Sequence, residues 1–392
     1  MTMFVQLICP NRNEQEKNEI YQVLGLLCKR EQIQIEERLD CVEILVCPQG
    51  KIQVTEKGKD VFLSATTRFA GPGFHAFVVE FFFDLQEEIE GNYEFKDDLN
   101  YDGDFDALCS IYEDEIVYLK DLLLKNSDMQ TQNYMYEQTY FLPLNDSHSI
   151  LTPIGKIDKE EFKRMDEKSL LPYFYIWNEW DKDAQFYKNA ALYELCNYGA
   201  GKYTLMNEST LKHANQICDY IECAYQMDAS ISLPLKEYKY LCQQLERLNK
   251  CENGVQMEQE IYQYRLKEVY HLFSNVKVVC HGWAERSYDP VSKALVLMAP
   301  YQKDTEWHYM IQASLYPYIC TKQSQLEQGQ SILYRNKQIQ IQTLKEENHY
   351  EIEAIIKEKS TLYFHCVCQE EKYIPYLTQC IKESEFQLEM DQ

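Results

Sequence analysis

The chain has 392 residues, with 39 Lys or Arg against 63 Asp or Glu, which gives a formal net charge of −24 at pH 7. This excess of negative charge repels phosphate backbones and anionic lipids, so it argues against general nucleic-acid binding and membrane binding. The hydrophobic fraction of 45% is sufficient for packed cores and argues against overall disorder, and the length predicts more than one domain.

The first region, residues 1–148, is predicted to be a mixed α+β domain. Apolar runs bounded by turn residues predict strands, and apolar residues spaced three and four apart predict helices. The expected strands are Phe4–Cys9, Val42–Cys47, Ile52–Thr55, Val61–Ala65 and Thr139–Leu142. The expected helices are Asn13–Arg30, His75–Ile89 and an amphipathic segment that ends near Lys125.

The middle region, residues 149–275, is predicted to be helical, and residues 276–392 to form a C-terminal antiparallel sheet with a helix. The expected middle helices are Asp158–Lys168, Asp183–Tyr198, Ser209–Met227, Leu235–Leu248 and Met257–Phe273. The expected later strands are Val276–Cys280, Ala294–Met298, Ser331–Tyr334, Gln338–Leu344, Tyr350–Ile356 and Leu362–Cys368, followed by a helix at Lys372–Phe386. The pattern of Trp307–Ile319 fits either a strand or a helix.

The 15 cysteines are odd in number and scattered through apolar stretches, without any Cys-x-x-Cys pair. We therefore expect free, buried thiols rather than a disulfide framework or a zinc site. The first residues lack the pattern of a signal peptide, and no apolar run is long enough to span a membrane. These features predict a cytoplasmic protein of microbial origin, without a cofactor.

A Gly-rich turn between a predicted strand and a predicted helix is the best local motif for chemistry. It runs from Arg68 to His75 with the sequence RFAGPGFH. Backbone N–H groups at such a junction can hold an anion, and Gly71 and Gly73 would permit its close approach. Arg68 and His75 would then supply charge or act as acid and base. The simpler interpretation, which we favour, is that Gly and Pro turn the chain tightly into the helix.

An acidic loop resembles the first half of a calcium-binding loop in its spacing. The candidate ligands are Asp98, Asn100, Asp102 and Asp106. The twelfth position is Cys109 instead of the bidentate Glu that such a loop needs. The alternative, which we favour, is that Asp102 or Asp104 caps the following helix.

Three further motifs are weighed against structural roles. Gly199-Ala-Gly-Lys-Tyr lacks the spacing of a phosphate loop, so Gly199 is interpreted as a helix C-cap. His281 and Glu285 are catalytic candidates if both face a cleft, although such residues more often satisfy each other or the backbone. In the predicted strand at residues 365–368, alternation separates His365 from the thiols of Cys366 and Cys368, so no shared metal is expected.

The acidic and aromatic stretch around Trp177, Trp180 and Asp181 is typical of a surface that binds another protein. The alternative, which we favour for this stretch, is a hinge between domains whose aromatic rings pack between helices. Without a complete catalytic motif, we expect a non-catalytic interaction protein, such as an adaptor, an accessory subunit or an immunity-type protein. Its partner would be another protein, and the net negative charge favours a basic one. The alternative is a hydrolase or transferase with an anion site at residues 68–75.

Overall fold

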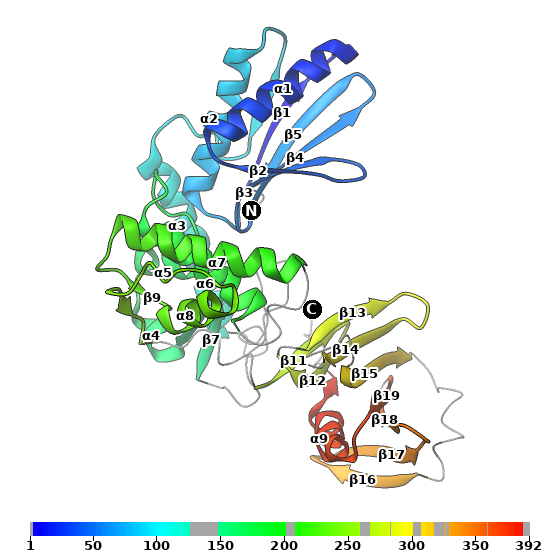
Figure 1. The fold of residues 1–392 in the computed structure, drawn as a ribbon. Coiled ribbons are helices and arrows are strands. Elements are labelled where there is room, and N and C mark those ends of the chain that lie inside the picture. The colour runs from blue at the N-terminus through cyan, green and yellow to red at the C-terminus, as the bar shows by residue number, and fades with distance from the viewer. Residues whose placement is uncertain are drawn as a thin grey trace. The chain divides into compact units, whose positions relative to one another are not determined.

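The computed structural model describes residues 3–125, 148–200, 208–258, 267–282, 284–300, 307–316, 326, 329–358 and 360–386. These residues belong to two compact units, one up to residue 258 and one from residue 267 (Figure 1). Both units combine helices with antiparallel sheets, which confirms the predicted α+β class. The predicted three-region division at 148 and 275 stays a prediction, because one compact unit can contain two such regions. Among the described helices, none has the length and apolar character needed to cross a membrane.

The first unit contains a six-stranded antiparallel sheet in the order β2-β3-β4-β5-β1-β6. Its strands are β1 (Phe4–Cys9), β2 (Gln34–Glu37), β3 (Val42–Cys47), β4 (Gly50–Lys57), β5 (Asp60–Thr66) and β6 (Glu94–Asp97). Helices α1 (Glu14–Arg30) and α2 (Pro72–Glu88) pack against each other and against the sheet. Asn13 caps α1 in a complete capping box with Glu16.

The two faces of this sheet differ because side chains alternate along each strand. Val5, Ile52 and Leu63 belong to the face that is fully buried. The opposite face presents Gln34, Leu45 and Lys51, which lie opposite one another across three neighbouring strands, and it is only partly covered. The polar face is therefore available to line a site.

The rest of the first unit is mainly helical. Its elements are α3 (Phe105–Lys125), β7 (Ser149–Thr152), β8 (Gly155–Asp158), α4 (Lys159–Arg164), α5 (Glu167–Phe174), α6 (Ala184–Tyr198), α7 (Glu208–Met227), β9 (Ser232–Leu233), α8 (Leu235–Gln244) and β10 (Val255–Gln256). Helix α3 packs on α5, and α6 packs on α7. Gly199 ends α6 with a φ of 71°, which confirms its predicted C-cap role.

The second unit is built on a seven-stranded antiparallel sheet in the order β13-β14-β15-β19-β18-β17-β16. A smaller sheet, β11-β12-β20, shares a buried core with it and with helix α9. The bounds are β11 (Glu268–Phe273), β12 (Val276–His281), β13 (Glu285–Asp289), β14 (Ala294–Pro300), β15 (Trp307–Tyr316), β16 (Gln330–Tyr334), β17 (Lys337–Lys345), β18 (Tyr350–Lys357), β19 (Thr361–Cys368), a 3-10 turn at Glu371–Tyr373, α9 (Ile374–Glu383) and β20 (Glu385–Phe386).

Some predicted elements differ from the observed ones. The helix predicted at Met257–Phe273 is wrong at its C-terminal end, because residues 268–273 form strand β11 paired with β12. The apolar residues there fit both a helical and an alternating pattern, and pairing with β12 decides between them. The single helix predicted at Asp158–Lys168 is divided into α4 and α5. The strand predicted at Thr139–Leu142 lies outside the described residues.

Candidate functional site

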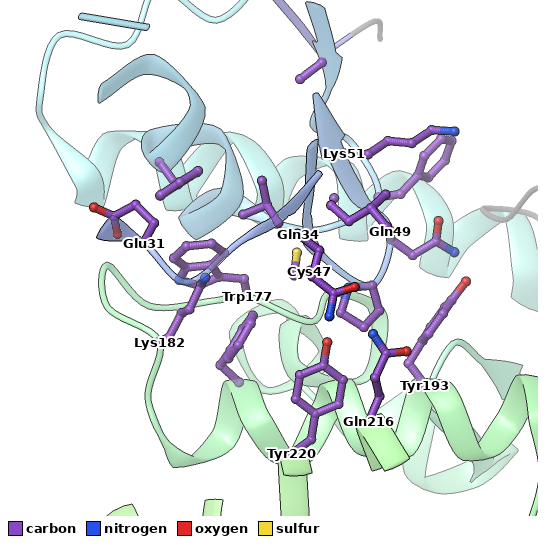
Figure 2. A pocket seen from close by; sticks show the side chains of 18 of the residues that line it. Glu31, Gln34, Cys47, Gln49, Lys51, Trp177, Lys182, Tyr193, Gln216 and Tyr220 are labelled. Carbon is purple, nitrogen blue, oxygen red and sulfur yellow. The ribbon is translucent and has the colours of Figure 1, made fainter. Parts of the chain in front are cut away.

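A large cavity in the first unit lies between the polar face of the sheet and the helices α6 and α7. Its volume is about 1410 Å³. The sheet contributes Gln34 and Lys51 to its lining, and the helices contribute Tyr193, Gln216 and Tyr220 (Figure 2). Aromatic rings and amide groups thus line the same cavity, a combination that supplies both apolar contact and hydrogen bonds to a ligand.

The residues predicted to bind a partner all line this cavity. Trp177 is 3% exposed, and its ring lies between those of Phe77 and Phe186, at centroid distances of 5.6 and 5.2 Å. Trp180 is 42% exposed and packs edge-on against Phe105. Asp181 is exposed. The segment therefore combines a fixed aromatic wall at Trp177 with an accessible ring and carboxylate at its end.

The carboxylate of Glu80 lies close enough to those of Asp84 and Asp181 for their charges to interact. Burial raises the pKa of Glu80, and the charges of Asp84 and Asp181 raise it further. Glu80 and Asp181 both line the cavity. Asp84 already pairs with Arg30, so the repulsion between Glu80 and Asp181 is the one that a bound cation would lower.

The Gly-rich turn at the start of α2 holds the Trp177 segment in place. The N–H of Gly73 donates to the carbonyl of Trp177 at 3.1 Å, and the N–H of Trp177 donates to the carbonyl of Ala70 at 2.9 Å. The N–H of Gly71 faces the carbonyl of Thr67 at 3.4 Å. A Cβ on Gly73 would lie 2.0 Å from Cδ1 of Trp177. The glycines thus allow the two backbones to approach closely. The N–H groups of Gly71 and Gly73 are directed at protein carbonyls rather than at a free anion site.

Arg68 and His75 have separate partners. Arg68 donates through Nε to Glu115 at 3.0 Å, and its Nη2 also contacts that carboxylate. His75 is fully buried, with Nδ1 2.8 Å from Thr67 Oγ1 and Nε2 3.2 Å from Asp97 Oδ1. The structure therefore does not bring the two predicted catalytic groups together on an open surface.

The contacts around His75 form a buried chain rather than an accessible triad. Tyr112 donates to Thr67, and the amides of Leu99 and Tyr101 donate to Asp97. Burial raises the pKa of Asp97, but the adjacent His75 ring and these amides lower it more, so that it lies below the ordinary value. The chain thus links α2 to the sheet through buried polar groups.

In the acidic loop that was weighed as a calcium site, the carboxylates of Asp102 and Asp104 accept hydrogen bonds from the backbone. Asp104 accepts from the N–H of Ala107 at the start of α3, and Asp102 accepts from the N–H of Asp104. The predicted ligands Asp98, Asn100 and Asp106 lie in the same loop or in the first turn of α3. Within the described part of the chain, no group of three or more His, Cys, Asp or Glu side chains is arranged to hold a metal ion.

His281 and Glu285 lie in the second unit, on different strands. The His281 ring stacks on Tyr376 of α9 at a centroid distance of 4.7 Å, and its Nδ1 is 3.9 Å from Glu268. Burial lowers the pKa of His281, and the charge of Glu268 opposes this shift. Glu285 is exposed on β13, where it pairs with Met298. Their surroundings are those of a packed histidine and a surface carboxylate.

Two groups in the cavity were not identified from the sequence. The ammonium of Lys182 lies 4.9 Å from the centroid of Trp177 and 5.6 Å from those of Phe77 and Phe186. His213 of α7 pairs through Nδ1 with Glu194 of α6 at 2.8 Å, and its ring stacks on Tyr198. Lys182 directly follows the candidate Asp181 in the sequence, but nothing local indicates the rings that enclose it. No local pattern joins Glu194 to His213.

Comparisons with protein-family models, with curated proteins and with solved structures find no match to this chain.

Proposed function

We propose that this protein binds a basic segment of another protein in the cavity of its first unit. The observation that carries the proposal is that Trp177, Trp180 and Asp181 line this cavity together, beside the opposed carboxylate of Glu80. The proposal retains the predicted role of a non-catalytic adaptor, accessory subunit or immunity-type protein.

The size and lining of the cavity favour a polypeptide segment. Its volume of about 1410 Å³ is larger than the roughly 300–1,000 Å³ of ordinary small-molecule sites. Trp180 and Tyr193 can serve as aromatic anchors. Gln34 and Gln216 can form hydrogen bonds to a peptide backbone, and Figure 2 shows both on the cavity wall. The net charge of −24 attracts a basic partner from a distance and accelerates its association.

The experiment that tests this function is affinity purification of the tagged full-length chain from the cells that make it, followed by mass spectrometry. A stoichiometric partner that is lost at high salt is the expected result. The double substitution Trp180→Ala, Asp181→Lys should abolish its recovery. Tyr288→Ala is the matched control, because Tyr288 is an exposed aromatic residue of the second unit. Equal recovery with both variants, or no partner at native expression, would contradict the proposal.

A second candidate function is acid–base catalysis in the same cavity. The observation that favours it is the pairing of His213 Nδ1 with the buried carboxylate of Glu194, which fixes the imidazole ring. A histidine oriented in this way can take a proton from a water or a hydroxyl group at its second nitrogen. A screen of chromogenic esters and phosphoesters should then reveal an activity that His213→Gln removes and Tyr198→Phe retains. Absence of turnover in the unaltered chain counts against this function.

A further inference from the structure

Three aromatic rings surround the side-chain ammonium of Lys182 at one end of the cavity. Phe77 comes from α2, Trp177 from the segment that follows α5, and Phe186 from α6. All three ring centroids lie within 5.6 Å of Nζ. Figure 2 shows Lys182 beside the Trp177 ring. The rings form an aromatic cage, a name used below for Phe77, Trp177 and Phe186.

The cage holds its cation mainly by contact with aromatic faces. In the described part of the chain, Lys182 makes no hydrogen bond or ion pair, although the chain carries many carboxylates. Burial lowers the pKa of Lys182, and Cys47 and Glu31 only partly oppose this effect. The ammonium is thus largely desolvated, and its contacts with the rings replace a part of its hydration.

We propose that the aromatic cage is a binding site for an alkylated ammonium group and that Lys182 fills it when no ligand is bound. This inference rests on the proposed function in one respect: the ligand ammonium would be carried by a methylated lysine of the bound segment. The position of the cage, within the cavity that Trp180 and Asp181 also line, places it within reach of such a segment.

The chemistry of the two ammonium groups decides which of them the cage prefers. A primary ammonium binds water strongly through its three N–H donors, and it loses this hydration among rings that accept no strong hydrogen bond. A methylated ammonium keeps its charge but is less hydrated, so it enters the same cage at lower cost. Release of Lys182 into water would offset a further part of the cost of binding. Exchange of Lys182 for an alkylated ligand is therefore favourable.

The test uses the full-length chain and choline as the probe, with calorimetric titration at constant ionic strength. Lys182→Ala empties the cage, so it should bind choline at least about tenfold more tightly than the unaltered chain does. The neutral isostere 3,3-dimethylbutan-1-ol should bind at least about tenfold more weakly than choline. Lys182→Met, which refills the cage with an uncharged chain, is the matched control and should bind choline as weakly as the unaltered chain.

A third variant tests the rings themselves. Phe186→Leu, added to Lys182→Ala, should remove most of the gained affinity. Circular dichroism shows whether Lys182→Ala folds. If it does not, NMR titration of the unaltered chain replaces calorimetry of the variant. The indole signal of Trp177 should then shift on addition of choline and not on addition of the alcohol. Equal binding of choline and alcohol, or no gain on emptying the cage, would overturn the inference.

The outcomes for the two proposals can be separated. A captured partner whose affinity is unchanged by Lys182→Ala and by enzymatic demethylation would refute the cage and leave the proposed function standing. Choline binding without any captured partner would support the cage as a small-ligand site and refute the link to a protein segment.

Discussion

Replacement of Gly73 by alanine should destabilise the first unit severely, although it adds only one methyl group. The new Cβ would lie 2.0 Å from Cδ1 and 2.3 Å from Nε1 of Trp177, and 2.4 Å from the carbonyl oxygen of Glu179. Ordinary carbon contacts are about 3.5–4.0 Å, so the indole would have to move by about 1.5 Å or more. It has little room to do so, because it is buried between Phe77 and Phe186.

The cost has two parts. Overpacking a core typically costs about 1–3 kcal/mol. Displacement of the segment also weakens the hydrogen bond from Gly73 N–H to the Trp177 carbonyl, which is worth about 1 kcal/mol. The free energy of unfolding should therefore fall by about 2–4 kcal/mol.

Gly25→Ala provides the matched control, since Gly25 lies inside α1 and nothing is within 4 Å of a Cβ added there. It should stabilise the chain by about 0.5–1 kcal/mol, because alanine loses less conformational freedom in a helix. Urea unfolding followed by circular dichroism at 222 nm measures both changes. An unchanged urea midpoint for Gly73→Ala, or similar shifts for both variants, would show that Trp177 is not seated against this glycine.

Three other substitutions or treatments follow from buried charges and thiols. Burial raises the pKa of Glu222, but Lys250 and Arg247 lower it below the ordinary value. Glu222→Gln should therefore lower the free energy of unfolding, measured in urea, by about 1–3 kcal/mol. A loss under about 0.5 kcal/mol would contradict this prediction. The lowered pKa of Asp97 means that its stabilisation is full above about pH 4, the ordinary pKa of aspartate, and is lost as the pH falls through its native value. Asp97→Asn should therefore flatten the decline of the urea midpoint below about pH 4, and an unchanged decline would count against this role. Burial raises the pKa of the Cys47 thiol to about 12, so its alkylation by iodoacetamide at pH 8, measured by peptide mass spectrometry, should be at least about a hundredfold slower than in urea.

The sequence predicts the long elements of this chain better than the short ones. Strand Phe4–Cys9 and the helix ending at Arg30 are found where they are expected, because both have sustained apolar periodicity. Strand β2 at Gln34–Glu37 was not predicted, since it is polar and mostly exposed and forms by pairing with β3. Strand β6 within the acidic loop also depends on its partner, β1. Short strands of this kind are specified by long-range pairing rather than by their own residues.

The candidate site can be predicted only in part, because it also depends on contacts between residues far apart in the sequence. Composition makes Trp177 and Trp180 candidates for partner binding beside the favoured hinge role, and both line the cavity. Nothing local indicates that Lys182 is enclosed by Phe77 and Phe186, because these rings are brought to it from two helices. The pairing of Glu194 with His213 likewise requires α6 and α7 to pack on each other.

The two most distinctive motifs of the sequence belong to a single junction, and this links stability to the proposed binding. The Gly-rich turn holds the backbone of Trp177 through two hydrogen bonds, and the Trp177 ring forms one wall of the aromatic cage. A change at Gly73 should therefore weaken the binding of an ammonium ligand even though Gly73 itself does not line the cavity. A change at Gly25 should leave that binding intact, because α1 contributes no ring to the cage. The close approach of two backbones, which only glycine permits, thus serves two purposes. It stabilises the turn, and it holds the site in place.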